Sequence, residues 1–199
     1  MLSDPDRRRM MQMSLLAAAA GVLPLVKLGN ALAQDTARAP VTASGGIHDF
    51  DFFVGTWQMH HRRLKERLIG SKAWEEFDGV THARSMIGGI CNLNDSIVNR
   101  ASGTFRSLGL RAYDAKTGLW GDWYLSARDP HKIDVPGFGR FENGIGTFLS
   151  DDVHKGTPVK VRGLWTPYSS TSLQWEQAFS ADGGKTWETN WVMRYKRTA

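Results

Sequence analysis

The chain has 199 residues, of which 41% are hydrophobic and 23% charged, which is typical of one globular domain with or without a tail. This composition excludes a disordered chain, and the single Cys91 excludes an internal disulfide framework and a cysteine-rich zinc site. The formal net charge is +5, and eight Trp, nine Phe and four Tyr are a heavy aromatic load for a core.

The first 33 residues have the layout of an export signal. Basic residues at 7–9 precede an apolar run of 13 residues at 14–26, and residues 31–33 (Ala-Leu-Ala) form a small-x-small cleavage sequence. The apolar run is shorter than the roughly 20 residues that span a bilayer. The pair Arg7-Arg8, followed by one residue and two apolar ones, resembles a twin-arginine signal. We therefore expect a periplasmic protein without a stable membrane span after cleavage, a retained N-terminal anchor being the alternative.

Cleavage after residue 33 would change the charge of the chain. It would leave 21 basic against 18 acidic residues, so part of the positive excess belongs to the signal. Residues 34–46 are small and polar with Pro and Gly, which favours a flexible leader, and residues 47–199 remain for the folded domain. With so small a positive excess, we expect no nucleic-acid partner.

From residue 47 onward the pattern predicts short strands joined by turns roughly every 8 to 12 residues. The expected strands are 57–64, 73–86, 91–98, 106–113, 119–126, 140–142, 145–149, 159–165, 173–179 and 186–195. Asn143-Gly144 suits a type I′ hairpin turn, and 151–158 is expected to be a polar turn. A meander of about nine or ten strands favours an all-β antiparallel up-and-down barrel, because closure removes exposed edges. The main helix candidate is Leu64–Ile69.

The first expected strand opens on Phe53-Val54-Gly55-Thr56-Trp57, which resembles the Gly-x-Trp opening of the calycins, that is, of lipocalins and fatty-acid-binding proteins. The resemblance implies that Trp57 closes one end of the barrel beneath a basic residue of the last strand. It assigns that place to Arg194, with Arg197 as second choice. Three segments of the chain are similar to a family of secreted bacterial lipocalin-like domains of unknown function: FDFFVGTWQMHHRRLKERL, WEEFDG and WEQAFSADGGKTWETNW. The likeness covers most of residues 47–197 and implies a fold without an established chemistry.

Strand alternation places His61 and Arg63 inside this barrel if Trp57 points inward, and it leaves His60 outside. A buried His or Arg needs hydrogen-bond partners or a ligand. The pair would then hold a carboxylate or phenolate, or His61 would act as acid and base while Arg63 stabilises an enolate-type charge. The structural alternative is pairing with an acidic residue: Glu75, Glu76 or Asp122.

Aromatic and polar residues of other strands share the inward faces. An aromatic pocket with a few convergent polar groups is the usual build of a small-molecule site. The expected lining residues, besides Arg63, are Asp122, Tyr124, Trp165, Trp175, Gln177, Thr189 and Trp191. A one-residue slip in register would bring Glu176 and Asn190 inward instead.

No motif indicates a metal or a cofactor, and we expect neither. The other histidines are spread along the chain without metal-ligand spacing. The glycine pairs 88–89 and 183–184 are expected in turns, and neither precedes a helix with the Lys-Ser/Thr of a phosphate loop. Cys91 is expected to be a small core or strand residue. The basic stretch 60–67 favours a plain solvated edge, or a rim that attracts an anionic ligand.

Three functions remain open at this point. The first is binding of a small hydrophobic or aromatic molecule, with or without an anionic group. The second is a cofactor-independent isomerase, cyclase or lyase that uses the same pocket. The third is a structural or interaction module with a filled barrel. A fold does not choose among them.

Overall fold

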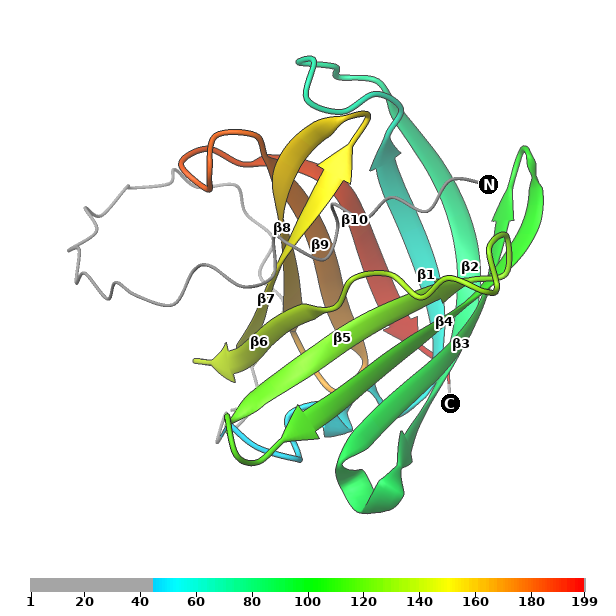
Figure 1. Cartoon of the computed structure of the whole chain (residues 1–199). Coiled ribbons are helices and arrows are strands. Elements are labelled where there is room, and N and C mark those ends of the chain that lie inside the picture. Colours follow the sequence, from blue (N-terminus) through cyan, green and yellow to red (C-terminus); the bar gives the residue numbers. More distant parts are fainter. Residues whose placement is uncertain (1–44, 199) are drawn as a thin grey trace, which may run out of the picture. The chain divides into compact units, whose positions relative to one another are not determined.

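The computed structural model describes residues 45–198, which form a closed antiparallel barrel of ten strands in which β1 also pairs with β10 (Figure 1). The all-β up-and-down barrel predicted from the sequence is confirmed. The predicted signal of residues 1–33 and the leader up to residue 44 lie outside the described residues. The strands are β1 (Gly55–Leu64), β2 (Trp74–Met86), β3 (Cys91–Arg100), β4 (Gly103–Asp114), β5 (Leu119–Ser126), β6 (Gly137–Glu142), β7 (Ile145–His154), β8 (Thr157–Pro167), β9 (Ser172–Ser180) and β10 (Glu188–Arg197).

Tight turns with positive φ set the hairpins. Asn143 and Gly144, with φ of 53° and 79°, join β6 to β7 as a type I′ turn requires. Lys155 and Gly156, with φ of 49° and 85°, join β7 to β8. The expected polar turn at 151–158 is therefore wrong in extent, because β7 continues to His154. Cys91 begins β3 and is buried, as expected of a small strand residue.

The helix predicted at Leu64–Ile69 is wrong. Leu64 is the last residue of β1, and residues 65–73 form a loop to β2. The loop takes positive φ at Leu68 (63°) and Gly70 (72°), which a right-handed helix does not allow. The Lys65 amide donates to the Ala73 carbonyl at 2.9 Å, so the loop is closed at its base as in a hairpin.

A short 3-10 helix, η3 (Asp51–Phe53), closes the end of the barrel where β1 begins. Trp57 is fully buried there, and its indole N–H donates to the Phe53 carbonyl at 2.8 Å. The Arg197 guanidinium lies over the indole at 4.1 Å. The assignment of Arg194 to this place was wrong: Arg197 pairs with Trp57, whereas Arg194 pairs with outward-facing His60 and is exposed. A second 3-10 helix, η4 (Ile87–Gly89), joins β2 to β3.

The opposite end of the barrel is its mouth. In an antiparallel meander that starts at the closed end, the loops after the odd-numbered strands all meet at the other end. The loop after β1 and the β7–β8 turn therefore lie at this mouth, although three strands, β8, β9 and β10, separate β1 from β7 around the barrel on its shorter side.

Candidate functional site

Three tryptophans form an aromatic wall inside the barrel. Trp165, Trp175 and Trp191 come from the consecutive strands β8, β9 and β10. Ring centroids lie 6.4 Å apart between Trp165 and Trp175, and 5.7 Å apart between Trp175 and Trp191. The inward register expected for these residues agrees with the strand pairing, because Trp165 pairs with Trp175. Trp165 is buried in the core against Phe50 and Phe53, so Trp175 and Trp191 are the rings of this wall that keep accessible apolar surface inside the barrel.

His61 continues the aromatic wall on β1. Its ring is 2% exposed and stacks on Phe77, with centroids 4.6 Å apart and planes 18° from parallel. The indole N–H of Trp191 donates to His61 Nδ1 at 3.2 Å. An indole nitrogen can only donate, so Nδ1 must accept and the proton of the neutral ring sits on Nε2. Burial lowers the pKa of His61 from 6.5 to about 4, so the ring is neutral at pH 7.

That arrangement leaves one hydrogen-bond donor of His61 unused. Nε2 is buried and has no hydrogen-bond partner among the described residues. A buried N–H without a partner is destabilising by about 1–3 kcal/mol, which is the reason such groups are rare in folded proteins. His61 therefore holds a fixed donor beside the aromatic wall that has no acceptor among the described residues.

A polar wall faces the interior from β2, β3 and β4. The Asn94 amide donates to Thr81 Oγ1 and to Ser96 Oγ, both at 3.0 Å. The Arg111 side chain donates to the oxygens of Asn92 (3.2 Å) and Asn94. These side chains satisfy one another, so the wall is built of connected hydrogen bonds rather than isolated polar groups.

Arg111 and Asp122 form the deepest charged pair of the barrel. Arg111 is 2% exposed, and its Nη1 lies 3.9 Å from Asp122 Oδ1. Trp165 Nε1 donates to Asp122 Oδ2 at 3.3 Å, which links the polar wall to the aromatic wall. Burial raises the pKa of Asp122, with Arg111 opposing the change, and burial lowers the pKa of Arg111.

Several inward-facing side chains beside these walls keep accessible surface. The Asp122 side chain keeps 21% of its surface accessible although it faces inward beside Arg111. Other inward-facing side chains are also only half-buried: Tyr124, Trp175, Gln177, Trp191 and Met193. Accessible surface on the inner face of a closed barrel has to border a space inside it. Solvent therefore reaches part of the inner face between the polar and aromatic walls.

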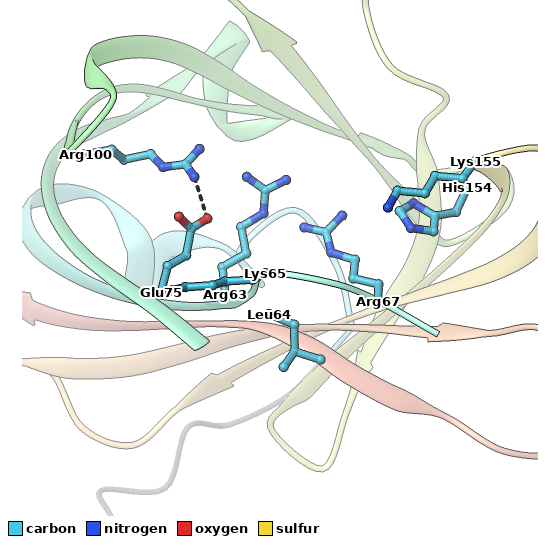
Figure 2. A pocket seen from close by; sticks show the side chains of 8 residues that line it. All are labelled: Arg63, Leu64, Lys65, Arg67, Glu75, Arg100, His154 and Lys155. Atoms are coloured by element: carbon cyan, nitrogen blue, oxygen red, sulfur yellow. Dashed lines mark hydrogen bonds and ion pairs between the residues drawn. The ribbon is translucent and has the colours of Figure 1, made fainter. Parts of the chain in front are cut away.

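A hollow of about 280 Å³ lies at the mouth. Figure 2 shows Arg63, Arg67 and Arg100 turning their guanidinium groups into it, with Glu75 beside Arg100. Glu75 Oε1 accepts from Arg100 at 2.5 Å. The remaining lining residues come from both sides of the mouth: Leu64, Lys65, His154 and Lys155.

Seven residues expected to line a pocket face the interior of the barrel: Arg63, Asp122, Tyr124, Trp165, Trp175, Gln177 and Trp191. Thr189 was placed on the wrong face. A bulge between Thr189 and Trp191 shifts the register, so that Thr189 pairs with outward-facing Ala178.

Of the second-choice residues, Glu176 faces outward, next to Gln174, whose amide donates to it. Asn190 is fully buried in the bulge, where its amide donates to the Glu188 carbonyl at 3.4 Å. His60 faces outward and contacts Asp78 at 2.8 Å.

The sequence pattern did not indicate Arg111, Asn92, Asn94 or Arg100, whereas Arg67 belongs to the basic stretch 60–67, for which an anion-attracting rim was one expectation. Arg111 shares its face with Ser107 and Gly109, while Leu108 and Leu110 alternate with it and look like the buried set. No signal in the strand itself favours the polar face as the inner one. Arg100 could have been found by stepping two residues from buried Val98.

Within residues 45–198, no group of three or more His, Cys, Asp or Glu side chains has the arrangement of a metal site. Among the helices that the structure describes, none is long and apolar enough to cross a bilayer.

Comparison with known proteins gives only distant structural likenesses. No family model matches the chain, and no curated protein matches it. One similar solved structure is EF1p2_mFAP2b bound to DFHBI, with 10% identity and a TM-score of 0.41 over 76% of this chain and 98% of that one. Another is the S-type phycobiliprotein lyase CPES from Guillardia theta, with 11% identity and a TM-score of 0.48 over 75% of this chain and 90% of that one. At these scores neither likeness bears on what this chain binds. The ten-strand barrel itself fits a calycin-like fold.

Proposed function

We propose that this barrel binds a small, flat aromatic molecule in its interior, with an oxygen acceptor of the ligand facing His61 Nε2. The observation that carries the proposal is the unpartnered Nε2 donor, fixed by Trp191 and Phe77 at the edge of the aromatic wall. A flat ligand gains burial from the tryptophans, and its acceptor satisfies a donor that otherwise stays unpaired.

A binding role is better supported than a filled structural barrel. A module with a filled interior would bury its inward side chains completely. Here Trp175, Gln177 and Asp122 keep accessible surface although they face inward. A mostly apolar hollow with a few polar groups is the usual form of a small-molecule site.

Catalysis with His61 as the general base is less well supported. A general base works best when its pKa lies near the working pH, and burial lowers the pKa of His61 to about 4. Its Nδ1, the atom with the free lone pair, is occupied by the indole N–H of Trp191. The ring is thus placed to donate a hydrogen bond and not to take a proton.

The cellular compartment in which the barrel works is a separate part of the proposal. The twin-arginine-type signal expected at residues 1–33 would carry the barrel, residues 47–199, to the periplasm. Fractionation of cells that express the chain, with and without the double change Arg7→Lys and Arg8→Lys, tests this. Periplasmic recovery of the parent and retention of the variant inside the cell support export, and equal recovery of both contradicts the twin-arginine route.

A titration with a neutral aromatic ketone tests the binding proposal. The probe 6-propionyl-2-dimethylaminonaphthalene has a flat ring system and a carbonyl whose emission responds to hydrogen bonding. We expect saturable binding, weakened about fivefold or more by Trp175→Leu, because a stacking surface is lost. Trp187→Leu is the matched control, since Trp187 lies over outward-facing Arg162. The absence of saturable binding to the folded protein, or equal weakening in both variants, contradicts the proposal.

A further inference from the structure

We propose that Arg63, Arg67 and Arg100 at the barrel mouth form an oxyanion site that binds a carboxylate, sulfonate or phosphate group of the ligand. This inference rests on the proposed function, because the aromatic part of the same ligand would lie against the tryptophans below. It narrows the ligand class to aromatic anions. The three residues are called the mouth arginines from here on.

The charge at the mouth is unbalanced. Arg100 pairs with Glu75 at 2.5 Å, and Glu75 is the one acidic residue among those that line the hollow. Arg63 and Arg67 make no ion pair within 4.0 Å with any carboxylate of the described residues. Two guanidinium groups thus share a partly enclosed space without a carboxylate in direct contact, although Glu75 and Glu188 lie near enough to act on them. The basic residues that line the hollow outnumber its one carboxylate, and such a space concentrates anions.

The arginines are placed away from free solvent. Arg67 lies over Phe179 at 5.4 Å, and burial, followed by the nearby Arg63, lowers the pKa of Arg67 to about 10. The Arg100 side chain is 17% exposed, and its Nε is buried without a partner among the described residues. Across the hollow, His154 Nε2 is likewise buried without a partner. Arg100 Nε is therefore a buried donor without an acceptor, and an oxyanion in the hollow would accept from the guanidinium groups that line it.

The mouth arginines lie next to the interior site. The Arg63 guanidinium lies over the Trp191 ring at 5.0 Å, and Trp191 holds His61 through its indole N–H. A flat ligand against Trp191 would therefore carry a ring substituent to Arg63. The hollow of about 280 Å³ has room for one oxyanion group and some water.

The loop 65–73 brings Arg67 to the mouth through contacts with two other hairpins. Lys155, in the β7–β8 turn, donates to Glu66 Oε2 at 2.8 Å. The Leu68 amide donates to Glu188 Oε1 at 2.8 Å. These bonds hold the loop across the opening, so an anion bound by Arg67 would be covered as well as neutralised.

A matched pair of probes separates the anion site from the aromatic site. 1-Anilinonaphthalene-8-sulfonate and N-phenyl-1-naphthylamine share the same rings and differ in the sulfonate. We expect Arg63→Met and Arg67→Met each to weaken sulfonate binding about tenfold, the loss of one charge-assisted hydrogen bond, and to change binding of the neutral probe less than about twofold. Arg62→Met is the matched control, because Arg62 faces outward on the same strand, with Glu76.

One variant is expected to strengthen binding of the sulfonate probe, which misfolding would not do. Glu75→Gln removes the negative charge that lines the hollow, so it should tighten binding of the sulfonate probe about threefold or more and leave the neutral probe unchanged. Raising the salt concentration should weaken the binding of the sulfonate probe and leave that of the neutral probe unchanged.

The outcomes are distinguishable. If the neutral probe binds and the mouth variants alter neither probe, the oxyanion site is overturned and the aromatic site stands. If the sulfonate binds through the arginines and the neutral probe does not bind, the proposed function fails alone. If neither binds, both fail. If Arg63→Met and Arg67→Met lower adsorption to phosphatidylglycerol vesicles but do not weaken sulfonate binding, the cluster contacts a membrane surface and the ligand site is overturned.

Discussion

The indole N–H of Trp191 lies 3.2 Å from Nδ1 of His61, and this contact fixes what the histidine can do. It sets the tautomer, directs the remaining proton to Nε2 and holds the ring against Phe77. Because β10 supplies the tryptophan and β1 the histidine, the pair forms where the barrel closes. The pairing of β1 with β10 brings Trp191 to His61, and both side chains face inward, so the free Nε2–H lies inside the barrel.

The first prediction concerns stability at low pH. Burial lowers the pKa of His61 from 6.5 to about 4 in the folded chain, so between these values the unfolded chain binds a proton that the folded chain does not. The free energy of unfolding should be undiminished above about pH 6.5 and fall by roughly 3 kcal/mol as the pH drops to about 4. Urea denaturation at several pH values measures this. His61→Gln should lose that part of the slope and His60→Gln should keep it; equal slopes in all three proteins would count against a neutral buried His61.

The second prediction concerns the closed end of the barrel. Arg197 lies over Trp57 at 4.1 Å and donates to the carbonyls of Phe52 (2.6 Å) and Val54 (2.5 Å). Arg197→Met should therefore lower the free energy of unfolding by about 3 kcal/mol, since it removes charge-assisted hydrogen bonds and a cation–π contact. Arg194→Met should change it by less than about 0.5 kcal/mol. Urea midpoints of both variants check the assignment, and the reverse ranking would contradict it.

The third prediction concerns the buried pair. Asp122→Leu leaves Arg111 charged and enclosed, which should lower the free energy of unfolding by about 3 kcal/mol or more. The double variant Arg111→Met with Asp122→Leu should recover most of that loss, because no buried charge remains. A double-mutant cycle by chemical denaturation measures the coupling. Additive single effects would show that the two residues, 3.9 Å apart, do not depend on each other.

The fourth prediction tests the register around the β10 bulge. Gln177 pairs with Trp191 on the inner face, and Thr189 pairs with Ala178 on the outer face. Gln177→Leu should change the affinity for the naphthyl ketone about threefold or more, as the loss of one polar contact allows. Thr189→Val should leave it unchanged. A fluorescence titration of both variants decides, and an effect confined to Thr189→Val would mean that the bulge does not exist in solution.

The strands and hairpins could be predicted because the signals are local. Asn143-Gly144 needs positive φ, and the alternation through Leu173, Trp175, Gln177 and Phe179 holds in the structure. The helix expected at Leu64–Ile69 failed because six residues carry little helical signal, and closing the hairpin with β2 takes precedence.

The site was predictable only in part, because the inner face of a strand depends on its neighbours. Counting by two from Trp57 gives the inward His61 and Arg63, since β1 has no bulge. The same counting fails at Thr189, where a bulge adds one residue. In β4 the leucines face outward and Arg111 inward, because the neighbouring strand β3 supplies Asn92 and Asn94 as acceptors. A single strand does not contain that information.

The most direct test of the central claim is ¹⁵N NMR of the histidine rings, with resonances assigned by His→Gln variants and the naphthyl ketone as ligand. We predict that free His61 gives the pattern of a neutral ring protonated at Nε2 at pH 7, and that saturating ligand shifts its Nε2–H signal while the signals of outward-facing His60 stay in place. A charged or Nδ1-protonated His61, or a His61 signal unchanged by bound ligand, would contradict the account.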